Sequence, residues 1–258
     1  MIISTMVNKK VKRILLSISV LLFWILVWWG VSFIVNHNAN SPLIPSPLST
    51  AKALVNLLSL KSFYTAISLS LFRVLAGLSL AILIGAPLAF ACYRFSIIRT
   101  TITPFISVMK AMPVATFVLI LWITLRGNLL PICVGIIMVM PVIFQNILAG
   151  LDALDKDLTE VTKVFQLSLW KKMRIHILPS LRPYFFPAII TSIGLAFKSQ
   201  VAAEIIAYTN KSIGQYIYDA TYAGSNDQSF AWAVVIVAFS IGLEFACKAL
   251  LRTVKNES

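Results

Sequence analysis

The sequence predicts an all-α, polytopic membrane protein with six transmembrane helices. Hydrophobic residues make up 59% of the 258 positions and charged residues only 12%, with a mean hydropathy of +0.89. Long apolar runs alternate with short polar stretches, and about 20 apolar residues suffice to cross a bilayer as a helix. Basic residues gather at the ends of these runs. This pattern excludes an ordinary soluble domain.

The first apolar run predicts an uncleaved transmembrane helix over residues 14–35. It follows a basic tail and contains no charge. It is longer than the apolar region of a cleaved signal peptide, and no small-x-small cleavage site follows it. Its tryptophans include expected membrane-interface anchors: Trp24, Trp28 and Trp29. A polar, Pro-rich loop is expected over residues 37–50, then an amphipathic surface helix over 49–60, so that residues 1–61 form an N-terminal unit.

Five further spans are expected in a transmembrane domain over residues 62–251, with a short tail at 252–258. Prolines inside these spans remove backbone donors and predict bends. The expected spans cover residues 64–93, 102–125, 129–151, 183–207 and 230–251, and the prolines are Pro87, Pro113, Pro141 and Pro187.

Charge distribution orients the predicted helices. With the N-terminus in the cytoplasm, the external segments hold only Lys52, Lys61, Arg126 and Lys211. The cytoplasmic segments then hold Lys9, Lys10, Lys12, Arg13, Arg94, Arg99, Lys156, Lys163, Lys171, Lys172, Arg174, Arg182, Lys248, Arg252 and Lys255. This excess matches the positive-inside rule and places both termini in the cytoplasm. The net charge of +13 therefore reflects membrane topology, and no nucleic-acid partner is expected.

A polar segment over residues 152–181 lies between the fourth and fifth spans, on the cytoplasmic side. Asp157 and Glu160 have the spacing of a capping box, which predicts a helix start at Asp157. Ser168 predicts the cap of a second short helix. Pro179 predicts the end of that helix. Two amphipathic helices at an angle would result, which suits either docking to a protein or lying on anionic lipid headgroups.

The spacing within this segment resembles the EAA loop of the membrane subunits of bacterial ABC importers. Glu160 is followed six residues later by Gln166, and Leu178 and Pro179 complete the pattern. Some positions depart from the motif: Val161 and Thr162 replace the two alanines, Gln166 the glycine and His176 the isoleucine. The resemblance implies that this segment is a coupling helix docking on an ATPase subunit, with contacts expected at Glu160, Gln166, Leu178 and Pro179. It further implies a type I ABC importer-like fold.

Several short stretches of sequence, which occur in the same order along the chain as in one group of importers, make the resemblance more specific. Residues 43–47, 70–77, 150–154, 201–204 and 213–214 are similar to permeases of the nitrate/sulfonate/taurine importer group, which also includes transporters of pyrimidine precursors. The resemblance implies a homodimer in the bacterial inner membrane, two ABC ATPase subunits and an extracytoplasmic substrate-binding protein. No phosphate-binding Gly-x-x-x-x-Gly-Lys-Ser/Thr motif occurs, so no cofactor is expected in this chain, and ATP and Mg belong to the partner ATPase.

Polar residues in the fifth span are candidates for lining a translocation path. Lys198, Gln200 and Glu204 lie in an otherwise apolar run, and ionisable groups at membrane depth require a partner or water. The alternative is pairing between helices, for example Lys110 or Arg73 with Glu204. A path lined by Lys198 would suit an anionic or strongly polar solute by electrostatic attraction.

Two other function classes were weighed against a permease. A membrane-embedded enzyme would need convergent catalytic groups, and no catalytic residue is assigned. Neither a metal site nor a disulfide is expected from the two histidines and three cysteines, which show no ligand spacing. A passive channel or scaffold would need no coupling loop. The sequence therefore predicts a permease that is not itself an enzyme.

Overall fold

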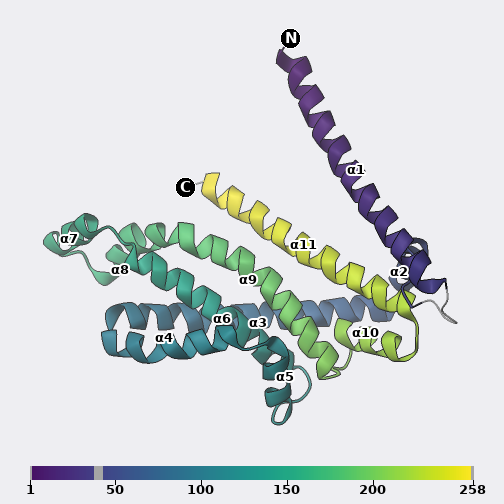
Figure 1. The fold of residues 1–258 in the computed structure, drawn as a ribbon. Coiled ribbons are helices and arrows are strands. Elements are labelled where there is room, and N and C mark those ends of the chain that lie inside the picture. Colours follow the sequence, from purple (N-terminus) through teal and green to yellow (C-terminus); the bar gives the residue numbers. More distant parts are fainter. Residues whose placement is uncertain (1, 38–42, 257–258) are drawn as a thin grey trace.

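The computed structural model describes residues 2–37 and 43–256, and every regular element in those ranges is a helix. Part of the predicted polar loop (38–42) and the last tail residues (257–258) lie outside the described residues. Figure 1 shows the helices in chain order: α1 (Ile2–Asn36), α2 (Pro47–Leu58), α3 (Lys61–Arg94), α4 (Ser96–Ala111), α5 (Val114–Trp122), α6 (Leu129–Asp152), α7 (Lys156–Val164), α8 (Leu169–Lys172), the π-helical turn η1 (Met173–Ile177), α9 (Leu178–Ile206), α10 (Ile213–Tyr222) and α11 (Asn226–Asn256).

The number of apolar spans agrees with the predicted polytopic fold. Within the described residues, five helices are long and apolar enough to cross a membrane, or six if the bent pair α4 and α5 is one span. The predicted span over 102–125 is divided at Pro113, where a bend was expected, into α4 and α5, which meet at 100°. Pro113 disfavours the helical conformation of the preceding Met112, which is extended (φ −77°, ψ 134°).

The fifth span also differs from its prediction. The helical segment Leu169–Ile206 runs without interruption through α8, η1 and α9, so the boundary expected at Pro179 is wrong. Pro179 is the second residue of α9, which follows the π-helical turn η1 directly. In this π-helical turn the backbone hydrogen bonds join residues five apart instead of four, as when the Leu178 N–H donates to the Met173 carbonyl.

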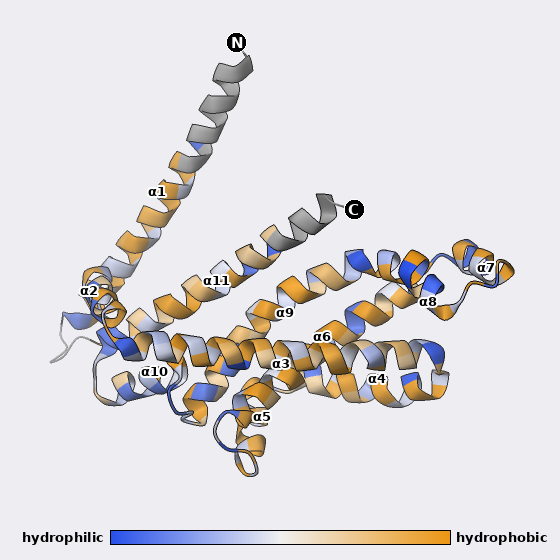
Figure 2. Cartoon of the chain, turned by 180° about the vertical axis from the view of Figure 1, so that it is seen from behind, coloured by the Kyte–Doolittle hydropathy of each residue, from blue (hydrophilic) through white to orange (hydrophobic). Residues whose placement is uncertain are grey.

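The core lies where α3, α6 and α9 pack together (Figure 1). Small residues allow close approach of these helices: a Cβ on Gly150 would lie 2.8 Å from Leu181 and 2.9 Å from Tyr184. Most of the long helices are built largely of hydrophobic residues (Figure 2), and many large apolar side chains are exposed. Helices satisfy their own backbone groups, so such apolar faces suit contact with lipid.

Helix α1 extends away from the other helices and meets them near its C-terminal end (Figure 1). There, Ser32 Oγ donates to the Ile44 carbonyl (2.8 Å) and Trp28 Nε1 to the Pro45 carbonyl (3.1 Å). Trp28 also stacks on Phe230 of α11, with ring centroids 6.1 Å apart. These contacts position the first span beside α2, the amphipathic helix that the sequence predicted.

Candidate functional site

The polar segment over residues 152–181 contains helix α7 (Lys156–Val164), and the N-terminal cap of this helix differs from the prediction. The Asp155 side chain accepts from the backbone N–H groups of Asp157 (2.9 Å) and Leu158 (3.4 Å). The predicted capping box of Asp157 with Glu160 is therefore wrong. Because α7 starts at Lys156, Asp157 lies within its first turn, where a carboxylate still stabilises the positive end of the helix dipole.

The turn between α7 and α8 places Gln166 in a left-handed conformation. Its φ is +47°, and the Leu167 N–H donates to the Thr162 carbonyl (3.1 Å). This is a Schellman arrangement, in which glycine is the favoured residue. Ser168 then caps α8 as predicted, accepting from the Lys171 N–H at 3.4 Å. The turn therefore keeps the geometry that glycine would favour, although the residue is glutamine.

Replacing Gln166 with glycine should stabilise this turn. A non-glycine residue in the left-handed region costs about 1 kcal/mol, so we expect Gln166→Gly to raise the free energy of unfolding by up to that amount, measured in mixed detergent micelles. The matched control is Gln228→Gly in α11, which has an ordinary helical backbone and should lose up to about 1 kcal/mol. If the free energy of unfolding fell equally in both variants, Gln166 would not be strained in the native turn.

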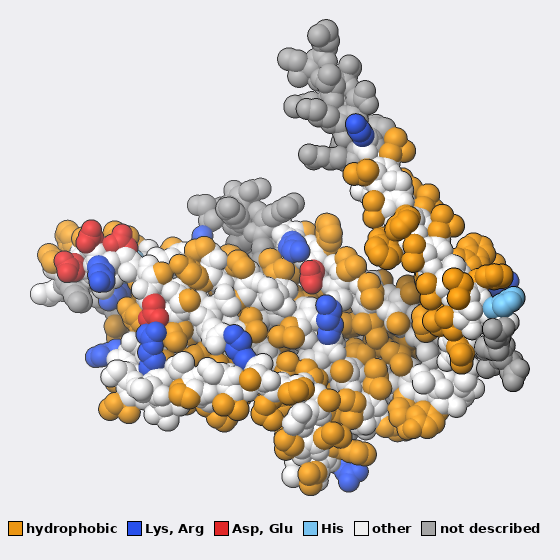
Figure 3. Space-filling view, in the orientation of Figure 1, with side chains coloured by type: hydrophobic (Ala, Val, Ile, Leu, Met, Phe, Trp, Pro, Cys, Tyr) orange, Lys and Arg blue, Asp and Glu red, His pale blue; other side chains and the backbone are white. Residues whose placement is uncertain are grey.

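Several apolar side chains of this polar segment are not covered by any other residue that the structure describes. Phe165 is 72% exposed, Leu169 83% and Trp170 75%. Glu160, Gln166, Leu178 and Pro179, the predicted contact residues, are exposed as well. Figure 3 shows acidic and basic side chains gathered around this same end of the molecule. The segment thus presents an apolar surface flanked by charges.

The other side of α7 packs against η1. His176, which stands where the EAA motif has isoleucine, is buried, and its Nε2 lies 3.1 Å from the Thr159 hydroxyl. The Thr159 hydroxyl also donates to the Asp155 carbonyl (2.8 Å). Thr162 is buried in the same contact. A polar contact therefore fixes α7 to the helical segment that continues into α9.

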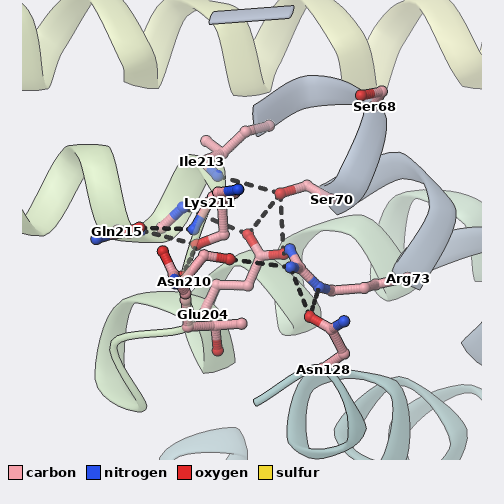
Figure 4. Close-up of polar contacts among 12 residues, drawn as sticks. Ser68, Ser70, Arg73, Asn128, Glu204, Asn210, Lys211, Ile213 and Gln215 are labelled. Atoms are coloured by element: carbon pink, nitrogen blue, oxygen red, sulfur yellow. Dashed lines mark hydrogen bonds and ion pairs between the residues drawn. The ribbon is translucent and has the colours of Figure 1, made fainter. Parts of the chain in front are cut away.

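A buried ion pair lies near the opposite end of α9. Arg73 Nη1 of α3 lies 2.8 Å from Glu204 Oε1, and both side chains are 1% exposed. The Ser70 hydroxyl lies 2.9 and 2.8 Å from the two carboxylate oxygens. Figure 4 shows these three side chains directed toward one another. Of the two partners considered for Glu204, Arg73 is the one in contact, while Lys110 instead donates to Gln145 (2.6 Å).

Further contacts extend this pair into a cluster that joins four parts of the chain (Figure 4). Arg73 donates to the Asn128 side chain before α6 (3.0 and 2.7 Å) and to the Asn210 carbonyl (3.1 Å). The backbone N–H of Gly214 in α10 donates to Glu204 (3.3 Å). Asn128 and Asn210 were not predicted from the sequence as members of this cluster. The only feature in the sequence that points to either residue is its position next to a predicted span.

The three path candidates do not converge in this chain. Gln200 is buried between Gly77 and Gly135, and its Oε1 has no partner among the described residues. Glu204 is buried in the cluster. Lys198 is exposed on α9 and makes no hydrogen bond or ion pair within the described part of the chain. The geometry therefore favours a structural role for Gln200 and Glu204 and leaves Lys198 as the accessible candidate.

Residues 77–255 match the family model described as "Binding-protein-dependent transport system inner membrane component". The chain belongs to this family. It is 24% identical over 249 residues to the taurine transport system permease protein TauC of Escherichia coli, covering 93% of this chain and 89% of that one. It is 28% identical over 252 residues to the nitrate import permease protein NrtB of Synechococcus elongatus, with 92% and 86% covered.

Solved structures show the same fold. The chain resembles a subunit of the MetNI methionine ABC transporter (TM-score 0.63, 17% identity, 73% of this chain and 94% of that one). It also resembles one from a bacterial importer of the acidic polysaccharide alginate (TM-score 0.62, 16% identity, 95% and 98% covered). The predicted permease of the nitrate/sulfonate/taurine type is thus confirmed, and the chain is a multi-pass membrane permease of an ABC importer.

Proposed function

We propose that the chain forms, as a homodimer with two ABC ATPase subunits, the path for a small polar or anionic solute delivered by an extracytoplasmic binding protein. Relatives are named for taurine, nitrate and bicarbonate, which motivates the solute class. The observation that supports this function best is the exposed apolar surface between α7 and α8, at the cytoplasmic end of the predicted topology.

An ATPase suits this surface better than lipid does. Lys171 and Lys172 would be attracted to anionic lipid headgroups. Three carboxylates are exposed on α7 and its cap, however: Asp155, Asp157 and Glu160. Carboxylates are repelled by an anionic membrane surface. An apolar patch rimmed by charges of both signs is typical of a protein interface. We therefore assign the docking surface to Glu160, Gln166, Leu178 and Pro179 with the neighbouring apolar side chains.

Purification of the tagged chain in mild detergent tests this function directly. Co-purifying chains would be identified, and ATP hydrolysis measured. We expect an ATPase subunit in equal amount with this chain. If the permease came alone and bound no ATPase, the α7–α8 surface would revert to lipid contact, and a passive channel or scaffold would become the better description.

Charge reversal at Glu160 tests the docking residue. We expect Glu160→Lys to reduce ATP-driven uptake at least tenfold while the protein still reaches the membrane, because the change places a cation in the docking surface. Uptake into membrane vesicles and the amount of co-purified ATPase would be measured together. Lys156→Glu, a reversal at the edge of the same helix, is the control, and uptake equal to that control would count against Glu160.

A further inference from the structure

Basic residues at membrane depth are not balanced by acidic ones in this chain. The sequence places Arg73, Lys110 and Lys198 within spans. Arg73 is neutralised by Glu204. The other carboxylate well inside a span, Glu244 of α11, lies 3.5 Å from Lys248. Lys110 and Lys198 therefore have no carboxylate within ion-pair distance among the described residues.

Lys110 lies far along the helices from the ends of α4 and α6 that are predicted to face the cytoplasm. The ion pair of Arg99 with Asp152 (2.7 Å) joins those ends of α4 and α6. Gln145, which accepts from Lys110 Nζ at 2.6 Å, lies seven residues before Asp152, or about 10 Å along the helix. The Lys110 side chain is exposed at that depth. A charged group there is stable only beside water or a counter-charge.

The face of α4 that carries Lys110 is polar along its length. Ser96, Thr100, Thr103 and Ser107 share the helical spacing of Lys110, and all four are exposed. The hydroxyls of Thr100, Thr103 and Ser107 donate to carbonyls one turn earlier in the helix, which leaves their lone pairs on the outer face. Water solvates such a face better than lipid does, so this side of α4 suits an aqueous path.

We propose that Lys110, held by Gln145, is an anion-binding station in the translocation path, at which a small oxyanion contacts the ammonium group. Gln145 is neutral, so it orients Nζ without cancelling its charge, and an ammonium has two further N–H donors to offer. This assignment rests on the proposed function, because it takes the polar face of α4 to line the translocation path.

Cysteine accessibility tests the station without requiring transport. Cys92, Cys133 and Cys247 would be replaced by alanine, and Ser107→Cys introduced one turn from Lys110. Membrane vesicles of both orientations would be treated with a sulfonate-bearing methanethiosulfonate, itself a small anion, or its trimethylammonium counterpart. Leu83→Cys, on the apolar outer surface of α3, is the lipid-facing control.

We expect both water-soluble reagents to modify Ser107→Cys, and the anionic reagent to react faster than the cationic one. Leu83→Cys should remain unreactive. Adding Lys110→Met should lower the anionic-to-cationic rate ratio about fivefold, from the loss of one charge roughly 8 Å away. Lys110→Arg should preserve the ratio. An unreactive Ser107→Cys would place this face against lipid or protein, and a ratio unchanged by Lys110→Met would remove Lys110 as the source of attraction. Either result overturns the station even if an ATPase co-purifies.

Discussion

Replacing Glu204 with leucine should destabilise the protein by about 3 kcal/mol, because the change leaves the buried Arg73 without its counter-charge. Arg73 would keep its hydrogen bonds to Asn128 and Asn210, but these partners are neutral. The free energy of unfolding in mixed micelles of sodium dodecyl sulfate and a mild detergent would measure the loss.

Two comparisons make this expectation specific. Glu244→Leu removes the half-exposed pair with Lys248 (3.5 Å), and such pairs contribute at most about 1 kcal/mol. The double variant Arg73→Leu, Glu204→Leu removes both charges and should recover most of the loss. If Glu204→Leu cost no more than Glu244→Leu, the buried cluster would not be a major source of stability.

Gly135→Ala should have the second largest effect, a loss of about 2 kcal/mol from overpacking. The added Cβ would lie 2.3 Å from Gln200 Nε2. Gln200 is 1% exposed, so its side chain has no open space into which it can move. The same unfolding assay would report the change.

The double variant with Gln200→Ala identifies the contact. In that background Gly135→Ala should cost less than about 1 kcal/mol, because the clashing side chain is gone. Gly242→Ala, where a Cβ meets nothing within 4 Å, should gain up to about 1 kcal/mol from helix propensity. Equal costs of Gly135→Ala with and without Gln200 would exclude this side chain as the obstacle.

Hydropathy and charge were sufficient to predict the membrane fold, but they did not predict breaks in the helices. Pro113 predicted a bend because it lacks a backbone donor, and Pro179 predicted a helix end because it also restricts the preceding Leu178. At Pro113 the chain bends by 100°, whereas at Pro179 the helix continues directly after a π-helical turn. The difference arises from backbone geometry around each proline, which hydropathy does not report.

The candidate site was predictable only in part for a similar reason. The spacing of Glu160, Gln166 and Pro179 located the cytoplasmic segment, but Asp155 and Asp157 both suit a helix start, and spacing did not select the observed cap. Arg73 and Lys110 were equal candidates to pair with Glu204, because sequence does not give the rotation of one helix relative to another. Packing of α3 against α9 selected Arg73.

The unbroken helical segment Leu169–Ile206 has a geometric consequence for how far its two ends move. Its 38 residues extend about 57 Å at 1.5 Å per residue, and the cluster around Glu204 fixes the C-terminal end of the segment to α3 and α10. If the segment tilts as a rigid rod about that fixed end, a rotation of only about 5° displaces Leu169 by about 5 Å, one helical turn. A displacement of that size at the α7–α8 end of the segment thus requires almost no movement at the end that carries Glu204.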